Sequence, residues 1–402
     1  MTPKKVLISG ASIAGPTLAF WLAHYGFDVT IVERADSLRL GGQNIDISGA
    51  AQKIAQLMGI EAEIKAANTG ELGVRFVNGD NVTQAELPVG ESNIGTRELE
   101  ILRGDLVDIL FKHTKDNVEY LFGNQITALL EDKDGVMVTF QKGEKRKFDL
   151  LICADGIRSR TRSLIFGDEP VIRFLNLYVS YFTIPKEATD SNWARWYNAT
   201  GARVIVMRPD NVGTTHASFS FMSEPKAYEQ LTAAEQKKVL KEKFADAGWE
   251  AERILAVLDT NPDIYFDGIS QVIAPRWWKG RCAMTGDAAY CPSPISGKGT
   301  SVAMIGAYIL AGELARHTDH EQAFIAYETL MRPHVKLVQK LPPGAPGLAH
   351  PKTKIGIALF NAVLRIISSR TVKKLSALFS SKDKLPTDDT IVLPDYQVKK
   401  IA

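Results

Sequence analysis

The chain has 402 residues, with 48 Lys and Arg against 46 Asp and Glu and a hydrophobic content of 45%, which is typical of a globular protein of two or three domains. The net charge of +2 leaves no basic surplus to neutralise a phosphate backbone, so nucleic acid is not an expected partner. No stretch approaches the roughly 18 consecutive apolar residues of a membrane-spanning helix, so we expect no integral membrane contact.

Two further features concern the cellular compartment. The first residues lead straight into a strand-like segment, without the apolar core of a signal peptide. Cys153, Cys282 and Cys291 are far apart and lack the paired spacing of a zinc site or a redox dithiol. We therefore expect a cytoplasmic protein without a metal site.

A strand, a glycine-containing turn and a helix follow one another at the start of the chain. Residues 6–9 are an apolar run typical of a buried parallel strand, residues 10–15 form the turn, and residues 16–25 carry apolar side chains at helical spacing. Gly26 stands where a helix end requires a positive φ, and residues 27–33 indicate a second strand that ends in an acid. This order predicts a βαβ unit.

The turn is suited to binding the pyrophosphate of a dinucleotide. Gly10 allows a tight turn, Gly15 allows the helix to pack closely on the strand, and the amides at the helix start attract an anion. Ser12 occupies the place of the middle glycine of the usual pattern, and Glu33 would hold a ribose hydroxyl. Such a turn is often only a tight loop, but the flanking strands favour dinucleotide binding. They do not distinguish FAD from a nicotinamide nucleotide.

Two later segments each join a buried strand to a glycine-aspartate step. Residues 148–162 contain a strand, an Asp-Gly turn and three arginines. Residues 280–289 contain a strand, a Gly-Asp step and two small residues. A Pro- and Gly-rich loop over 290–299 then leads into a helix that we expect over 301–316.

Three motifs therefore occur in order: Gly10-x-Ser12-x-x-Gly15, Asp155-Gly156-x-x-Ser159-x-x-Arg162 and Gly286-Asp287. In this order they resemble the ADP-binding turn, the Asp-Gly motif and the ribityl-binding Gly-Asp motif of the class A flavoprotein monooxygenases, the fold family of para-hydroxybenzoate hydroxylase. The resemblance covers nearly the whole chain. Within the family, residues 39–46 and 102–106 look most like the tetracycline-inactivating monooxygenases and related polyketide hydroxylases.

The resemblance implies an α/β fold built around a Rossmann-like FAD-binding domain. That domain would be discontinuous, over residues 1–170 and 274–340. A β-sheet substrate-binding domain would be inserted over residues 171–273, and a C-terminal helix over 348–382 would pack on both domains. We expect the protein to be a monomer.

The resemblance also implies FAD and NADPH as cofactors and assigns residues to them. Arg39 is the candidate for guiding the nicotinamide or a mobile flavin. The residues assigned to cofactor binding are Gly10, Ser12, Ile13, Ala14, Gly15, Glu33, Arg34, Arg39, Asp46, Arg103, Asp155, Gly286, Asp287, Pro294, Gly297, Gly299 and Thr300.

Several of these assignments compete with simpler roles. Asp287 would accept hydrogen bonds from ribityl hydroxyls, but Asp also caps turns and helices in many loops. Arg103 is equally consistent with a solvated helix residue, and Asp46 with a turn residue after a glycine pair. Residues 158–162 form either a cation-rich helix start or, by the resemblance, a link to NADPH and the pyrophosphate.

Two departures from the family pattern fall in the loop after the Gly-Asp motif. Tyr290 stands where many members have His, and Gly297-Lys298-Gly299 stands where Gly-Gln-Gly is usual. The glycines are retained. We therefore expect backbone contacts to FAD to persist and side-chain contacts to differ.

The middle of the chain is rich in β-type sequence, with strands predicted over 177–184, 202–207 and 214–221. In the last of these, alternation places His216, Ser218 and Ser220 on one face and the apolar residues on the other. The tetracycline-inactivating enzymes hold the polar edge of the substrate with an arginine and a histidine on such strands, although a lone strand histidine more often has no such role. The residues assigned to the substrate are Tyr181, Arg203, His216, Pro294 and Gly297.

The reaction implied by the resemblance places the chemistry on the cofactor. NADPH reduces the flavin, O₂ adds to it, and the flavin hydroperoxide transfers one oxygen atom to a phenolic or enolic polycyclic compound, with tetracycline-like molecules as leading candidates. No protein nucleophile is required. The alternatives are a flavin reductase or halogenase of the same fold, although the Trp-x-Trp-x-Ile-Pro segment of halogenases is absent, and an FAD-binding protein without catalytic activity.

The C-terminal region resumes after a Pro- and Gly-rich loop over 341–347 as a helical stretch from about 353 to 380. Its apolar run over 355–367 is too short to span a membrane and is interrupted by Arg365. Two interpretations remain. The helix packs across both domains and walls the substrate pocket, or it lies on a membrane surface.

Overall fold

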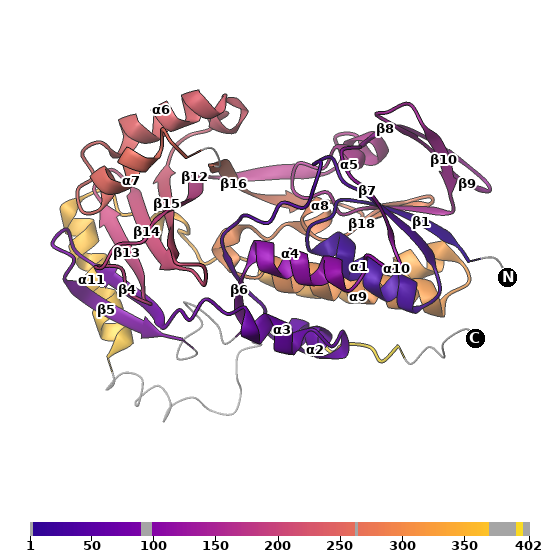
Figure 1. Ribbon diagram of the computed structural model, residues 1–402, viewed down its shortest axis with the longest axis horizontal. Helices are drawn as coiled ribbons and strands as arrows, with labels where there is room; N and C mark the ends of the chain where they lie inside the picture. Colours follow the sequence, from indigo (N-terminus) through magenta and orange to yellow (C-terminus); the bar gives the residue numbers. More distant parts are fainter. Residues whose placement is uncertain (1–2, 90–98, 262–263, 370–390, 397–402) are drawn as a thin grey trace.

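A computed structural model describes residues 3–89, 99–261, 264–369 and 391–396. Two large sheets organise these residues and lie towards opposite ends of the long axis of the molecule (Figure 1). The first sheet is largely parallel and the second largely antiparallel. The α/β class and the Rossmann-like character of the first domain are thereby confirmed.

The first sheet has the strand order β17-β18-β11-β1-β2-β7, with antiparallel β17 at one edge and all other neighbours parallel. Strands β1 and β11 are central and covered on both faces, which explains their uninterrupted apolar sequences. Its strands are β1 Lys5–Ser9, β2 Asp28–Val32, β7 Glu119–Leu121, β11 Leu150–Cys153, β17 Trp278–Lys279 and β18 Cys282–Met284.

Helices cover one side of this sheet, and a small antiparallel sheet of β8, β9 and β10 lies on the other side (Figure 1). Helix α9 is buried along almost its whole length, which explains its content of small residues. A further pair, β3 with β6, carries α4 at its end. These elements are α1 Ala14–His24, β3 Asn44–Asp46, α2 Ala50–Leu57, α3 Glu61–Ala66, β6 Glu100–Leu102, α4 Arg103–Lys112, β8 Ile126–Asp132, β9 Gly135–Phe140, β10 Lys145–Phe148, α5 Arg160–Phe166, α8 Asp287–Tyr290, η2 Pro294–Ser296, α9 Gly299–Arg316 and α10 His320–Val338.

The second sheet has the order β16-β12-β15-β14-β13-β4-β5. Helices α6 and α7 cover one of its faces, where Phe244 stacks on Phe219 with ring centroids 4.2 Å apart. Its elements are β4 Gly73–Val77, β5 Thr83–Pro88, β12 Val171–Pro185, β13 Ala194–Ala199, β14 Arg203–Pro209, β15 Thr214–Met222, η1 Tyr228–Gln230, α6 Ala233–Phe244, α7 Ala251–Val257 and β16 Tyr265–Ile273.

Strand β15 alternates between the two faces as the sequence predicts. Ala217, Phe219 and Phe221 are buried against the helices, whereas His216 and Ser218 are half-buried on the opposite face. We call this opposite side of the second sheet the polar face.

The second sheet is larger than the inserted segment predicted from the sequence. Strands β4 and β5, which we placed with the first domain, extend the second sheet through the parallel pairing of β13 with β4. The sequence did not reveal this pairing because residues 73–88 precede β13 by about a hundred positions and no short turn joins them.

The C-terminal helix, α11 Lys354–Ser368, follows a short η3 turn at Gly347–Ala349. It packs Leu364 and Phe360 on Phe76 and Leu87 of the second sheet, beside Trp196. In the part of the chain that the structure describes, this cluster contains no side chain of the first sheet, so packing on both domains is not seen. Residues 370–382 of the predicted helix lie outside the described residues.

Candidate functional site

The three sequence motifs meet at the carboxyl ends of neighbouring parallel strands. Strands β18, β11 and β1 lie side by side, and each ends where a motif begins. A Cβ on Gly10 would lie 2.5 Å from the Ala154 carbonyl oxygen, and a Cβ on Gly286 would lie 2.8 Å from the Ala14 Cβ. Only residues without side chains allow this approach. The three segments, more than a hundred positions apart in sequence, therefore form one site.

Glu33 holds the first turn in place. Its carboxylate accepts hydrogen bonds from the amides of Ala11 and Ala35, each 3.0 Å long. Gly10 and Ser12 are therefore held against the end of β2, where Glu33 stands. One pocket is lined by Ala11, Ser12, Glu33, Leu38, Arg39 and Arg103.

Arg103, the first residue of α4, reaches over this turn. Its guanidinium donates to the Ser12 hydroxyl at 3.2 Å, to the Arg39 carbonyl at 2.8 Å and to the Gly41 carbonyl. Burial lowers the pKa of Arg103, and the charge of Arg39 lowers it further. A cation in this position attracts a phosphate group. Arg34 and Arg39, in contrast, are exposed.

The Asp-Gly motif is tied to both of the other motifs. Asp155 accepts hydrogen bonds from the Ser159 hydroxyl and the Thr161 amide, and burial raises its pKa. Arg162 is buried and donates to the Ala288 carbonyl at 3.0 Å, immediately after the Gly-Asp motif. Asp155 and Arg162 are therefore held by protein groups, and their positions fix the arrangement of the motifs.

Asp287 begins α8 and lies within electrostatic range of the second sheet. It is half-buried, and burial raises the pKa of its carboxyl group. Tyr265, on the second sheet, has a raised pKa because of burial, Asp267 and, more weakly, Tyr181 and Asp287. The electrostatic interaction with Tyr265 also raises the pKa of Arg103. The first-sheet site therefore lies within electrostatic range of the second sheet.

The loop before α9 lies between the two sheets. Pro294 and Gly297 are exposed, whereas Thr300 is buried in the first turn of α9. Ile295 packs against Val179 and Ile269 of the second sheet. This loop therefore contributes to the boundary between the cofactor side and the substrate side.

Lys298, one of the two departures, is a buried cation at the start of α9. It is 7% exposed, and its ammonium group donates to the Ser48 hydroxyl at 3.2 Å. Ser48 is held in turn by Ser301. In the sequence, Lys298 was noted only because it replaces the glutamine usual in the family, and we did not assign it to the site.

Tyr290, the other departure, has a structural role. Its hydroxyl lies 3.0 Å from that of Thr285 and 3.1 Å from that of Tyr327, and its ring packs on Trp277 at 4.7 Å. Gly306 of α9 leaves room for the hydroxyl group. This side chain fills the core behind the site.

The polar face carries two of the predicted substrate residues. Tyr181 lies opposite Ser218 on the neighbouring strand, and its ring centroid is 5.9 Å from that of Tyr265. His216 lies on the same face two residues before Ser218, and its imidazole is 3.6 Å from the Asp210 carboxylate. Burial lowers the pKa of His216, whereas burial raises that of Tyr181 to about 12. Both side chains are therefore uncharged at neutral pH.

Arg203, predicted to hold the substrate together with His216, does not lie on this face. It lies opposite Phe221 in the β14–β15 register and therefore faces α6 and α7. There it donates to the carbonyl of Thr200 at 2.7 Å and pairs with Asp246. Cross-strand partners share a face, and Phe221 is on the helix side.

Arg208, which we did not predict, occupies the position expected for Arg203. It lies directly opposite His216 and forms a two-pronged ion pair with Glu71, at 2.7 and 3.0 Å. Glu100 lies 3.7 Å away. The sequence carried no decisive signal, because a turn over residues 210–213 would pair position 209 with 214, whereas the structure pairs Pro209 with Thr215. A shift of one residue exchanges the two faces of a strand.

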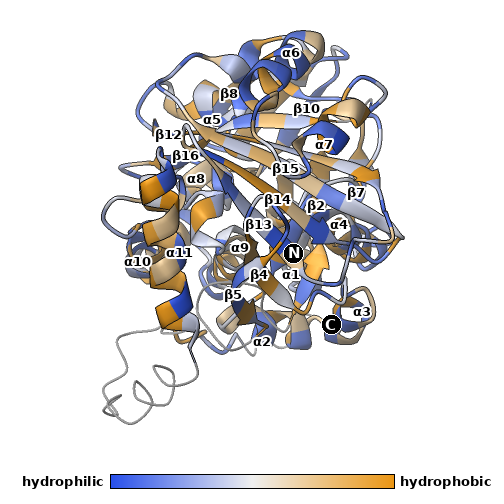
Figure 2. Ribbon diagram, turned by 90° about the vertical axis from the view of Figure 1, so that its left-hand side faces the viewer, coloured by the Kyte–Doolittle hydropathy of each residue, from blue (hydrophilic) through white to orange (hydrophobic). Residues whose placement is uncertain are grey.

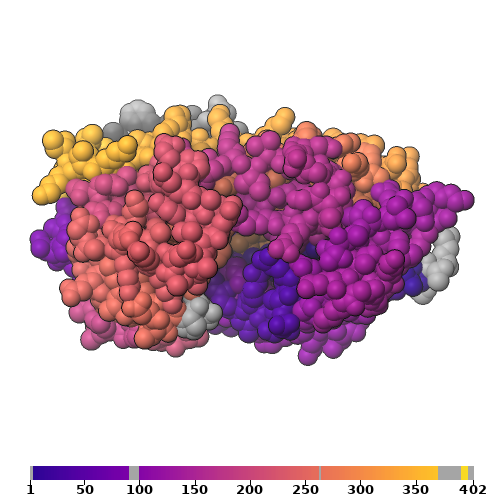
Figure 3. All heavy atoms as spheres, turned by 90° about the horizontal axis from the view of Figure 1, so that it is seen from above, coloured from indigo at the N-terminus to yellow at the C-terminus, as the bar shows by residue number. Residues whose placement is uncertain are grey.

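The polar face is turned towards the first domain, because Ile295 of the loop before α9 packs on it beside Val179. The surface is hollowed between the two halves of the molecule, and Figure 3 shows this hollow between the red helices of the second sheet and the indigo N-terminal residues. At the far end, His350 donates to or accepts from the Ser220 hydroxyl at 2.9 Å, and Asn198 donates to the Ala349 carbonyl at 2.8 Å. The loop before α11 therefore closes one side of the polar face.

Comparison with known proteins places this geometry in a family. Residues 4–340 match the family described as FAD binding domain. A flavin-dependent monooxygenase from an unknown prokaryotic organism is 41% identical over 339 residues, which are 84% of this chain and 88% of that protein. The chain belongs to the class A flavoprotein monooxygenases. It is an FAD-dependent oxidoreductase, and the resemblance seen in its motifs is confirmed.

Two solved structures extend the likeness of this monooxygenase over its whole length. The tetracycline destructase Tet(51) superposes with a TM-score of 0.82 at 32% identity, covering 98% of this chain and 100% of that one. The tetracycline destructase Tet(55) gives a TM-score of 0.79 at 34% identity, covering 98% and 99%.

The residues of this monooxygenase fit an FAD molecule. The glycine turn leaves no room for side chains, since a Cβ on Gly15 would lie 1.9 Å from the Gly10 carbonyl oxygen. The amides at the start of α1, the cation of Arg103 and the carboxylate of Asp287 lie along one edge of the first sheet. Anion-binding groups at one end and an acceptor for hydroxyl groups at the other match a pyrophosphate followed by a ribityl chain.

Proposed function

We propose that this monooxygenase uses NADPH and O₂ to add one oxygen atom to a phenolic or enolic polycyclic substrate, with tetracycline-like compounds as the leading candidates. The likeness to two tetracycline destructases along 98% of the chain supports the substrate class. The observation that carries the proposal is the pair of neutral hydrogen-bonding side chains, Tyr181 and His216, on a face against which the loop before α9 packs through Ile295.

FAD would be held mainly by backbone. The amides of residues 10–15 and the guanidinium of Arg103 would bind the pyrophosphate, Glu33 the ribose and Asp287 the ribityl hydroxyls. The first amides of α9, at Gly299 and Thr300, would face the pyrimidine edge. The flavin supplies the redox chemistry that activates O₂ when it is bound. The protein supplies position and a space from which water is excluded.

The substrate would lie on the polar face. His216 is neutral because burial lowers its pKa, so it can both donate and accept a hydrogen bond. Tyr181 keeps its proton because burial raises its pKa to about 12, so it can donate to a phenolate or enolate oxygen. Pro294 and Gly297 would border the substrate on the opposite side.

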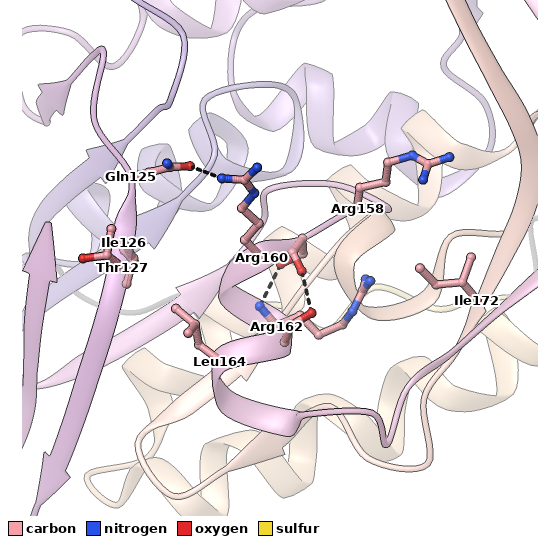
Figure 4. A pocket seen from close by; sticks show the side chains of 10 residues that line it. Gln125, Ile126, Thr127, Arg158, Arg160, Arg162, Leu164 and Ile172 are labelled. Atoms are coloured by element: carbon pink, nitrogen blue, oxygen red, sulfur yellow. Dashed lines mark hydrogen bonds between the residues drawn. The ribbon is translucent and has the colours of Figure 1, made fainter. Parts of the chain in front are cut away.

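We also propose that the phosphates of NADPH bind at the arginine-rich side of the Asp-Gly motif. A cavity of about 450 Å³ lies there, between α5, β8 and the start of β12 (Figure 4). Three of its lining residues are Arg158, Arg160 and Arg162. Arg160 is exposed and donates to the neutral Gln125 at 3.2 Å, so its charge is available to a phosphate.

Turnover with a panel of substrates tests the function. The purified holoenzyme is mixed with NADPH and, in turn, tetracyclines, anthraquinones and simple phenols, while NADPH oxidation and product masses are recorded. We expect oxidation to accelerate with a polycyclic compound and the product to gain the mass of one oxygen atom. NADPH oxidation without any oxygenated product would reject the proposal.

Arg160→Gln tests the NADPH site separately. An exposed ion pair contributes up to about 1 kcal/mol, so we expect KM for NADPH to rise about fivefold with kcat unchanged. KM for NADH, which lacks the additional phosphate, serves as the internal control and should change less. Equal changes in KM for NADPH and NADH would mean that the additional phosphate of NADPH does not bind at Arg160.

A further inference from the structure

Helix α11 has two apolar sides, and among the described residues only the inner side has packing partners. The inner side packs Leu364 and Phe360 on the second sheet, and Arg365 donates to the Gln84 side chain at 2.9 Å. These contacts fix the rotation of the helix about its axis. The side chains that point outwards are therefore held in that direction by the packing beneath them.

The outer side is a row of large aliphatic residues. Ile355 is 82% exposed, Leu359 65% and Ile366 60%, and Val363 and Ile367 are nearly half exposed. Positions 355, 359, 363 and 366 follow one another at helical spacing, so they form a continuous apolar strip. Figure 2 shows the helix on the outside of the molecule, coloured largely as hydrophobic. We call this strip the outer face of α11.

The sequence of α11 and of its flanks is basic. Lys352 and Lys354 precede the outer face, Arg365 lies within α11, and residues 351–369 contain no Asp or Glu. In the sequence that follows, residues 370–384 carry five Lys or Arg against one Asp. The rest of the chain, outside residues 352–384, carries 40 basic and 45 acidic residues. The positive charge of the sequence is therefore concentrated in the segment that contains this helix.

We infer that the outer face of α11 docks on an anionic membrane surface. An apolar strip bordered by Lys and Arg is the pattern of helices that lie in the plane of a bilayer, with the strip among the acyl chains and the cations among the headgroups. Among the described residues, no helix is long and apolar enough to cross a membrane. The contact would be one of docking on the surface.

A second copy of the chain fits this face less well. A two-fold symmetric contact would bring the basic segment of one copy against the equally basic segment of the other. The like charges would oppose the pairing, whereas an anionic lipid surface neutralises them. Charge complementarity therefore favours the membrane as the occupant.

Vesicle binding tests the inference with the full-length holoenzyme. The protein is sedimented with vesicles of phosphatidylcholine alone and with vesicles that contain phosphatidylglycerol, at low and high NaCl. We expect binding only to the anionic vesicles and weaker binding in high salt. The double variant Leu359→Gln/Ile366→Gln changes only exposed side chains, and we expect its partition coefficient to fall at least about tenfold.

Leu130→Gln is the matched control, because Leu130 is 72% exposed on β8, outside α11. This variant should bind the vesicles like the unmodified protein, and all variants should keep their bound flavin. Failure of the unmodified protein to bind anionic vesicles would overturn the inference. So would equal binding of the double variant, or a dimer in solution that the double variant abolishes without any vesicle binding.

Discussion

The two sheets contribute to the site in different ways. At the first sheet the contacts come from backbone, since glycines and amides at the ends of β1, β11 and β18 meet one another. At the second sheet they come from side chains that stand on one face, such as His216 and Arg208. A backbone site depends on the absence of side chains. A side-chain site depends on register and on neighbours that satisfy buried charge.

This difference predicts where substitutions are most harmful. At the second sheet, removal of one member of a buried ion pair leaves a charge without a partner. At the first sheet, addition of a single methyl group is enough to separate the motifs. The following predictions test this contrast, starting with the largest effect.

Arg208→Gln should destabilise the protein more than any other change considered. Burial alone would lower the pKa of Arg208, but Glu71 and Glu100 raise it, so the arginine stays charged between two buried carboxylates. Breaking such a buried pair costs about 3–5 kcal/mol of unfolding free energy. Urea unfolding at neutral pH measures the loss.

Acid should reduce the difference in unfolding free energy between Arg208→Gln and the unmodified protein, because protonation of the carboxylates removes the negative charge that Arg208 neutralises. Burial already raises the pKa of Glu100. We therefore expect the gap between Arg208→Gln and the unmodified protein to narrow as pH falls below about 5. A gap that is small at neutral pH, or that widens in acid, would show that the carboxylates do not need the arginine.

His350, which bonds to Ser220 of the second sheet, should make the stability of the protein depend on pH. Burial lowers its pKa from 6.5 to about 4, and the unfolded chain keeps the ordinary value. The unfolded state therefore binds the proton more tightly, so stability is complete above pH 6.5 and falls as the pH drops towards 4. This residue alone should cost about 2 kcal/mol between pH 7 and pH 5.

His350→Gln removes that titration and keeps a side chain that can bond to Ser220. The measurement is the free energy of unfolding of both proteins at several pH values. The curve of the variant should be flatter by the stated amount between pH 7 and pH 5. Parallel curves would mean that His350 is not buried as a neutral group.

Much of the first sheet was predictable, because its signals are local in sequence. The glycine turn, the acid after β2 and the two glycine-aspartate steps each follow a buried strand, and parallel strand ends meet at one edge. The second sheet depends on pairings between distant segments. The alternation of β15 was visible, but its register with β14 decided whether Arg203 or Arg208 stood on the polar face, and that register depends on the turn that joins the two strands.

Two features had no signal in the neighbouring sequence. They are the pairing of β4 with β13 and the burial of Lys298. Parallel strands need a long connection, so the sequence next to β4 says nothing of its partner. Lysine is rarely buried, and its contact with Ser48 joins positions 250 residues apart. Such features arise only when the whole chain is packed.

Gly15→Ala should weaken FAD binding at the backbone site. The added Cβ would lie 1.9 Å from the Gly10 carbonyl oxygen, so the turn must shift. Overpacking of this kind costs about 1–3 kcal/mol, which lowers FAD affinity roughly tenfold or more. Gel filtration followed by absorbance of the retained flavin measures the effect, and circular dichroism checks that the protein stays folded.

Gly347→Ala is the control for this substitution, since a Cβ there meets no atom within 4 Å. Its flavin content should equal that of the unmodified protein. If Gly15→Ala also retains its flavin in full, the turn does not bind the cofactor through close backbone contact.

The smallest effect should come from Arg203, and its contrast with His216 tests the assignment of the two faces. His216→Gln removes a hydrogen-bonding group from the polar face, and one such bond is worth about 0.5–1.5 kcal/mol, so kcat/KM for the substrate should fall about three- to tenfold. Arg203→Gln disturbs bonds that all lie on the helix side, to the Thr200 and Lys243 carbonyls and to Asp246, so kcat/KM should not change. Steady-state kinetics of the two variants with one substrate decide the matter. A larger loss for Arg203→Gln than for His216→Gln would mean that the substrate approaches from the side of α6, because only a ligand on that side can sense the arginine.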